Sequence, residues 1–148
     1  MKIAIASDHA GFELKNNLLS LLRNEGYELI DFGAESFNPD DDYPDFIGKA
    51  SEYVSENGGF GIVIGKSGAG EAIVANKYKG VRAVLCVNEE NVKLSREHND
   101  ANVLSIGSIL TDPEEAKKLV LLFINTPFSQ EERHKRRIEK IKKIEENS

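Results

Sequence analysis

Residues 65–71, GKSGAGE, combine the residue types of this chain that are best suited to chemistry on an anion. The three glycines let the backbone approach a ligand closely and adopt positive φ. A helix is expected to follow, and the amides of residues 66–70 at its N-terminus favour negative charge. Ser67 adds a hydroxyl and Glu71 a carboxylate. The segment predicts a catalytic loop around an anion, although Glu71 in a first helical turn would also simply complement the helix dipole.

The letters GKS also end the phosphate-binding loop of many nucleotide-binding proteins. That loop has the pattern G-x-x-x-x-G-K-[ST], in which the four spacers form the phosphate cradle. Phe60 stands where the first glycine belongs, and residues 62–64, IVI, are typical of a strand interior. The pattern G-x-G-x-x-G is also missing after the first expected strand. The sequence therefore argues against both kinds of nucleotide loop.

Two other groups of polar residues are candidates for the same site. Asp8 and His9 follow the first expected strand; Asp8 would also serve as a helix N-cap, whereas His9 has no comparable capping role. Arg133 and Arg137 are spaced i, i+4, so both face one side of a helix. Such a pair can grip a phosphate through forked hydrogen bonds, with a solvated basic face as the alternative.

The elements that must position these residues alternate between short β-branched runs and stretches of helical periodicity. We expect strands at 2–7, 27–33, 60–65, 81–87 and 102–107, and helices at 11–26, 46–57, from after 65 to about 77, 89–98, 113–125 and about 130–146. This alternation predicts a three-layer αβα, Rossmann-like (flavodoxin-like) fold. Its doubly wound parallel sheet has five strands in the order 2-1-3-4-5, with an extra C-terminal helix. Ligands bind such sheets where the strand order reverses, which brings SDHAG (7–11) beside residues 65–71.

Composition limits the possible classes of protein. The 148 residues suit a single domain, 1–148, and 40% hydrophobic with 30% charged residues is ordinary for a globular chain. No apolar run approaches the ~20 residues of a membrane span, and the N-terminus does not resemble a signal peptide, so we expect a cytoplasmic protein with no membrane partner. A net charge of −6 argues against nucleic-acid binding.

Metal and cysteine chemistry have little support. The single cysteine, Cys86, excludes an internal disulfide and a cysteine-based zinc site, and its apolar surroundings predict a small buried hydrophobe. Asp40, Asp41 and Asp42 are consecutive, which is more typical of a solvated loop than of a metal cage. No histidine pair has ligand spacing. We therefore expect no metal and no cofactor.

Five separated segments carry a family resemblance: SDHAG, DYPD (42–45), G-x-S-G-x-GE…ANK (65–77), SREHNDANVLSIG (95–107) and RHKRRIEKI (133–141). Together they resemble type B ribose-5-phosphate isomerase, in the family shared with the galactose-6-phosphate and allose-6-phosphate isomerases. The resemblance implies metal-independent interconversion of D-ribose 5-phosphate and D-ribulose 5-phosphate through an enediol(ate), in the non-oxidative pentose phosphate pathway.

Residue by residue, the resemblance implies three catalytic roles. Glu71 matches the base that moves a proton between C2 and C1, Ser67 belongs to the loop that stabilises the enediolate, and His98 matches the acid that opens the furanose ring. The positions that match substrate contacts are Asp8, His9, Tyr43, Ser67, Gly68, Ala69, Gly70, Asn99, Arg133 and Arg137.

Two departures from the family pattern bear on specificity. Some members use a cysteine base where this chain has Gly65, which places it in the glutamate branch. Many members have an arginine where this chain has Ile109, and Lys66 is a candidate to supply the missing charge. Six-carbon sugar phosphates therefore stay open as alternative substrates, and a non-catalytic sugar-phosphate-binding module is the alternative from a different class.

The expected topology separates two of the catalytic residues. His98 ends the helix before the fifth strand, which puts it at the amino edge of the sheet, whereas Glu71 lies at the carboxyl edge. We therefore expect a homodimer with pockets shared between subunits, in which His98 and Asn99 come from the partner; a tetramer is also compatible. The stripe of Ile138, Ile141 and Ile144 on the last helix would pack on that partner.

Overall fold

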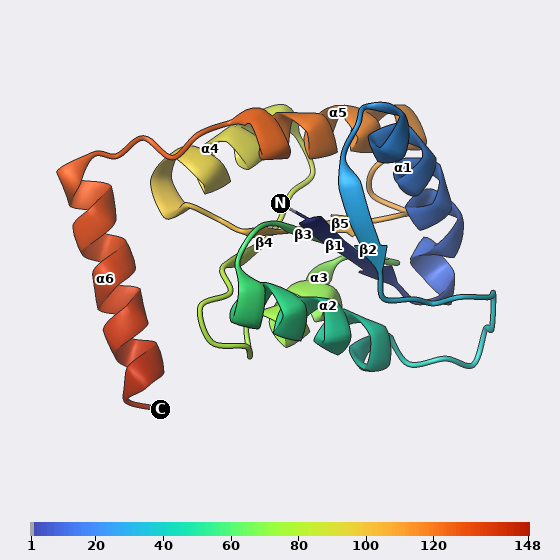
Figure 1. Ribbon diagram of the computed structural model, residues 1–148, viewed down its shortest axis with the longest axis horizontal. Helices are drawn as coiled ribbons and strands as arrows, with labels where there is room; N and C mark the ends of the chain where they lie inside the picture. Colours follow the sequence, from blue (N-terminus) through green and yellow to red (C-terminus); the bar gives the residue numbers. More distant parts are fainter. Residues whose placement is uncertain (1) are drawn as a thin grey trace.

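The computed structural model describes residues 2–148, which form one five-stranded parallel sheet between two layers of helices (Figure 1). The strands are β1 (Lys2–Ser7), β2 (Glu28–Asp31), β3 (Gly61–Gly65), β4 (Ala83–Leu85) and β5 (Val103–Gly107). Every neighbouring pair is parallel. The αβα architecture expected from the sequence is confirmed.

The order of the last two strands differs from the expected one. The sheet runs β2-β1-β3-β5-β4, so the predicted order 2-1-3-4-5 is wrong for β4 and β5. All five residues of β5 are buried, whereas β4 has three residues and is partly exposed. The fully buried strand takes the interior position and the short one forms the edge, as is usual in parallel sheets. The neighbours β1 and β3 are unaffected, so their two loops still meet.

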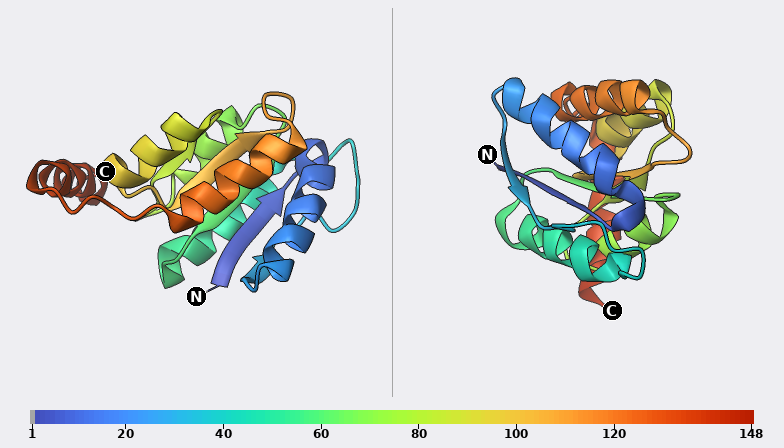
Figure 2. Two further views of the ribbon diagram at one scale, coloured as in Figure 1. Left: turned by 90° about the horizontal axis from the view of Figure 1, so that it is seen from above. Right: turned by 90° about the vertical axis from the view of Figure 1, so that its right-hand side faces the viewer.

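The helices form two unequal layers. One face of the sheet carries α1 (Phe12–Asn24), α4 (Glu89–Asn99) and α5 (Pro113–Asn125), and the other carries α2 (Tyr43–Asn57) and α3 (Ala69–Ala75) (Figures 1 and 2). A 3₁₀ turn at His9–Gly11 precedes α1. The helix expected from residue 46 begins at Tyr43, because Pro44 fits a first helical turn.

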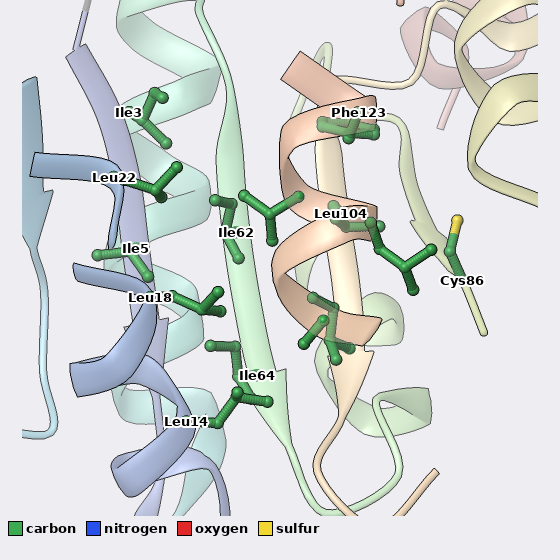
Figure 3. Packing of buried hydrophobic residues seen from close by; sticks show 14 of the residues in the cluster. Ile3, Ile5, Leu14, Leu18, Leu22, Ile62, Ile64, Cys86, Leu104 and Phe123 are labelled. Atoms are coloured by element: carbon green, nitrogen blue, oxygen red, sulfur yellow. The ribbon is translucent and has the colours of Figure 1, made fainter. Parts of the chain in front are cut away.

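Side chains of alternate strand residues enter two separate cores. In the larger one, Leu14, Leu18 and Leu22 of α1 pack against Ile62 and Ile64 of β3 (Figure 3). Cys86 is fully buried in this core, as expected, and its burial raises the pKa of the thiol to about 11. The thiol is therefore protonated at neutral pH and acts as a small hydrophobe.

The last helix, α6 (Glu132–Glu146), stands away from both layers (Figure 1). Near its C-terminus both carboxylate oxygens of Glu145 accept the backbone N–H of Gly80, at 2.9 and 3.0 Å. A hollow of about 760 Å³ lies between α6 and residues 76–84, and the exposed Ile141 and Ile144 line it. Within residues 2–148, no helix has the length and apolar character that a membrane span requires.

Candidate active site

Glu71 is a buried carboxylate at the point where β3 ends. It lies in the first turn of α3 and is only 4% exposed. Its carboxyl group packs directly on the Cα of Gly65, the last residue of β3, so a Cβ at residue 65 would overlap it. The side chain therefore turns back over the end of the strand. A surface residue that only complements a helix dipole would be exposed to solvent, so the alternative interpretation of Glu71 is wrong.

Burial is the largest influence on the pKa of Glu71. It raises the pKa of the carboxyl group above its ordinary value, and the negative charge of Asp8 raises it further. Hydrogen bonds from the backbone at residues 71 and 68 act in the opposite direction but do not cancel the rise. A carboxylate with a raised pKa is better matched to taking up and returning a proton near neutral pH.

The loop before α3 is held by close packing and by specific hydrogen bonds. Gly68 has φ of +82°, and its carbonyl accepts a 2.7 Å hydrogen bond from the buried hydroxyl of Ser105. Gly107 lies so close to the Ser67 backbone that a Cβ there would be 2.5 Å from the Ser67 carbonyl carbon. The Ser67 hydroxyl accepts the N–H of Ala69 at 3.3 Å. The loop is therefore preorganised around Glu71.

Two further segments reach this loop. The ring of Tyr43, at the start of α2, covers Gly70, where a Cβ would be 2.6 Å from Tyr43 Cζ. From the segment after β5, the N–H of Ile109 donates to the Lys66 carbonyl at 3.2 Å. The Ile109 side chain is 66% exposed beside this loop. The structure thus brings both Tyr43 and the backbone of Ile109 to the loop before Glu71.

The turn after β1 holds a carboxylate–imidazole–carboxylate cluster. One oxygen of Asp8 accepts the N–H groups of Ala10 and Gly11 at 3.0 and 3.3 Å, which confirms its capping role. The His9 ring nitrogen Nδ1 lies 2.7 Å from Asp41 Oδ1 and 4.0 Å from Asp8 Oδ2. The hydrogen bond to Asp41 and the charge of Asp8 raise the pKa of His9. The imidazole is therefore predisposed to carry positive charge.

Asp41 was not a candidate in the sequence. Its position in DDD predicted a solvated side chain, but only 8% of that side chain is exposed, so this prediction is wrong for Asp41. The error arises because the loop between β2 and α2 folds onto the turn after β1. Asp40 and Asp42 are exposed, as expected. A run of three identical residues contains no signal that marks the middle one.

The same cluster is the one group among residues 2–148 whose ligand atoms are close enough for a metal ion. Asp8, His9 and Asp41 each offer one atom, and these atoms lie within 4.8 Å of one another. Each of these side chains also has another partner or role, since Asp8 caps a turn and His9 bonds to Asp41. The absence of a metal from the reaction stays a prediction.

A second group of candidate residues lies on α4 and α6. The ring of His98, near the C-terminus of α4, stacks on that of His134 with centroids 4.3 Å apart and planes at 33°. His134 is buried, and its Nδ1 lies 2.9 Å from Ser129 Oγ. Burial, then the charges of His98, Arg133 and Arg137, lower the pKa of His134 against an opposite effect of Glu131. Its position between Arg133 and Arg137 was the only sequence signal for this residue.

The two groups are far apart in one chain. The loops after β1, β3 and β5 lie at the carboxyl edge of the sheet, whereas α4 ends at the amino edge and α6 follows there (Figure 2). The structure brings together Asp8, His9, Tyr43, Lys66, Ser67, Gly68, Ala69, Gly70 and Glu71. It does not bring these residues to the other group, which comprises His98, Asn99, Arg133 and Arg137.

The first group has the components of proton transfer next to a carbonyl. A carboxylate with a raised pKa can remove the proton, and donors that are already in place can hold the resulting oxyanion. The nearby imidazole of His9, whose pKa is raised, favours an anionic ligand when it is protonated. The arrangement suits an isomerisation through an enediolate.

Known proteins are similar to this one along nearly the whole chain. Residues 3–141 match the family model described as Ribose/Galactose Isomerase. Ribose-5-phosphate isomerase B of Mycolicibacterium paratuberculosis is 44% identical over 94% of this chain and 88% of that protein. The Clostridium thermocellum ribose-5-phosphate isomerase B structure has a TM-score of 0.95 and 42% identity, covering 99% of each chain. That of Mycoplasma genitalium, with bound ribulose-5-phosphate, has a TM-score of 0.96 and 38% identity, covering 99% of this chain and 97% of that one. The chain belongs to the ribose/galactose isomerase family.

Proposed function

We propose that this protein interconverts D-ribose 5-phosphate and D-ribulose 5-phosphate, with Glu71 as the base. The observation that carries the proposal is the buried Glu71 carboxylate, which packs on Gly65 beside a preorganised glycine loop. The similarity to ribose-5-phosphate isomerases B over nearly the whole chain supports the substrate. The bound ribulose-5-phosphate in the Mycoplasma genitalium structure supports a sugar phosphate as ligand.

In the proposed reaction the protein opens the furanose ring, moves one proton from C2 to C1 and one from O2 to O1, and stabilises the enediolate between these steps. His98 acts as the acid in ring opening. Glu71 then removes the proton from C2 of the open aldose and returns it to C1, while Ser67 and the amides of the loop hold the enediolate oxygens. A positioned base contributes about 10²–10⁴-fold to the rate, and each oxyanion donor about 10²–10³-fold.

The proposal includes a second copy of the chain. His98 and Asn99 lie at the amino edge of the sheet, whereas Glu71 lies at the carboxyl edge. Arg133 and Arg137 are exposed on α6 and would clamp the phosphate of a sugar bound to the partner. The exposed Ile141 and Ile144 offer an apolar surface for that contact. We therefore propose a homodimer with shared pockets, and a tetramer would keep the same pair.

A direct isomerisation assay tests the function. Purified protein is expected to convert ribose 5-phosphate to ribulose 5-phosphate, and to keep its activity after exhaustive chelation of metals. The Glu71→Gln variant keeps the size of the side chain and is expected to lose about 10²–10⁴-fold in kcat. Full function in Glu71→Gln together with tight sugar-phosphate binding would instead favour a non-catalytic binding module.

The residue at position 109 is a reason to test six-carbon sugar phosphates as substrates as well. Ile109 lies beside the loop before Glu71, and its side chain is 66% exposed. The family resemblance implies an arginine at this position in many members. Turnover of ribose 5-phosphate, allose 6-phosphate and galactose 6-phosphate should therefore be compared side by side. We expect ribose 5-phosphate to have the highest kcat/KM. The place in the pentose phosphate pathway and the cytoplasmic location stay predictions.

A further inference from the structure

His9 is held by the loop that joins β2 to α2. Asp41 Oδ1 accepts two hydrogen bonds from the same residue, one from the His9 backbone N–H at 3.1 Å and one from the ring Nδ1 at 2.7 Å. From the same loop, the ring of Phe37 meets the imidazole edge-on, with centroids 6.1 Å apart and planes at 84°. The loop therefore fixes both the backbone and the ring of His9.

The carboxylate that holds His9 is mostly removed from water. Only 8% of the Asp41 side chain is exposed, compared with 32% of the His9 side chain. The other oxygen, Oδ2, is buried and has no hydrogen-bond partner among the described residues. A surface carboxylate would not leave an oxygen in this state, because desolvation without a partner is costly. Within residues 2–148, both hydrogen bonds of the Asp41 carboxylate are therefore to His9.

The loop itself has a firm anchor behind Asp41. Lys15 of α1 is 1% exposed, and its ammonium group donates to the Ala34 carbonyl at 2.6 Å and to both Asp31 oxygens at 2.9 and 3.0 Å. This contact ties the start of the loop to α1, the helix that follows His9. Asp41 and His9 are thus attached to the same rigid part of the fold.

The hydrogen bond to Asp41 determines which ring nitrogen of His9 is available to a ligand. An ionised carboxylate only accepts hydrogen bonds, so Nδ1 carries the proton that it shares with Asp41. The remaining nitrogen, Nε2, then offers a donor when the ring is charged. The charged groups around the ring are Asp8 on its own turn, Asp40 and Asp41 on the loop, and Glu13 on α1. All four are acidic, which favours the imidazolium.

We propose that Asp41 is a positioning residue that acts through His9: it fixes the ring so that Nε2 presents a charged donor to the sugar phosphate. The inference rests on the proposed function, because His9 is taken to contact that substrate. Asp41 itself need not touch the ligand. Its role resembles that of the carboxylates that orient the imidazole of catalytic or metal-binding histidines elsewhere.

A double-mutant cycle separates this role from a structural one. Asp41→Asn keeps the shape but loses the charge, and we expect KM for ribose 5-phosphate to rise about tenfold with kcat changed less than about threefold. Asp42→Asn, an exposed neighbour in the same loop, is the matched control and should leave KM unchanged. In the His9→Asn background, Asp41→Asn should cause no further rise in KM. Equal, additive effects with and without His9 would overturn the proposal.

Nitrogen NMR of the imidazoles tests the same idea without substrate. The chain has three histidines, so His9→Asn assigns the His9 signals. We expect a protonated Nδ1 in the native protein and a lower pKa of His9 in Asp41→Asn. An Nδ1 without a proton in the native protein, or an unchanged pKa in the variant, would refute the positioning role. If the protein does not isomerise ribose 5-phosphate, the proposed function fails while these spectra still decide the role of Asp41.

Discussion

At the scale of single residues, the position of the Glu71 carboxyl group depends on the absence of a side chain at residue 65, the last residue of β3. The Glu71 carboxyl group fills the space that a side chain at residue 65 would occupy. A cysteine side chain at residue 65 and the present conformation of Glu71 would exclude each other. The glycine at 65 is therefore a requirement of the glutamate base and not only a feature of loop geometry.

Adding one methyl group at residue 65 tests this requirement. Gly65→Ala should still fold, because the atoms that must move are the end of the flexible Glu71 side chain. We expect kcat to fall about 10²-fold or more, since the base leaves its position. In the Gly65→Ala background, the additional change Glu71→Ala should lower kcat little further. A Gly65→Ala enzyme with native kcat would show that the carboxylate does not need this position.

The base should also reduce the stability of the fold. Since the folded-state pKa of Glu71 lies above its unfolded value, folding favours the protonated form. The contribution of this residue to stability is full below the unfolded pKa and is lost as the pH rises through the folded pKa. Glu71→Gln should therefore raise the free energy of unfolding at pH 7, and the gain should disappear in acid. Denaturant titration at several pH values checks this, with the exposed Glu52→Gln as control.

At the scale of helices and strands, the stack of His98 on His134 joins α4 to α6. It fixes the ring-opening candidate relative to the helix that carries Arg133 and Arg137. The 2.9 Å contact between His134 Nδ1 and Ser129 Oγ attaches the segment before α6 to the same point. The buried His134 therefore fixes His98 relative to Arg133 and Arg137, the residues that we propose contribute to the pocket of the second copy.

Removal of that histidine should affect binding and chemistry together. His134→Ala takes away the ring on which His98 rests, and we expect a roughly ten- to hundredfold loss of kcat/KM from misplacement of His98 and the arginines. Lys135→Ala, the exposed next residue on α6, should be close to native. Steady-state kinetics on ribose 5-phosphate would compare the two variants. Equal kcat/KM in both would contradict a role for the stack.

Local patterns and long-range contacts differ in what a sequence can reveal. The alternation of strands and helices and the glycine loop before Glu71 are local, and each was predictable. The place of β5 between β3 and β4 depends on competition for a buried position, which neighbouring residues do not encode. Asp41 is buried by a turn 32 residues away in the chain, and His134 by α4, so neither had a local signal.

At the scale of the whole molecule, the two groups of candidate residues occupy opposite ends of one chain (Figure 2). Within residues 2–148, α6 is the last element and follows α5, away from the loops after β1, β3 and β5. A small sugar phosphate cannot span that separation. The proposed catalysis by both groups would need two copies in an isologous pair, in which each copy gives α4 and α6 to the other.

Mixing two inactive variants tests this arrangement. Glu71→Ala chains lack the base and His98→Ala chains lack the ring-opening acid, so each alone should be nearly inactive on ribose 5-phosphate. After random exchange, half of the dimers contain one chain of each kind, and one of their two pockets is intact, so about one quarter of native activity should return. Subunit exchange is followed in parallel with mass-tagged chains. Confirmed exchange without any recovered activity would mean that Glu71 and His98 serve the same pocket from one chain, which would contradict the shared site.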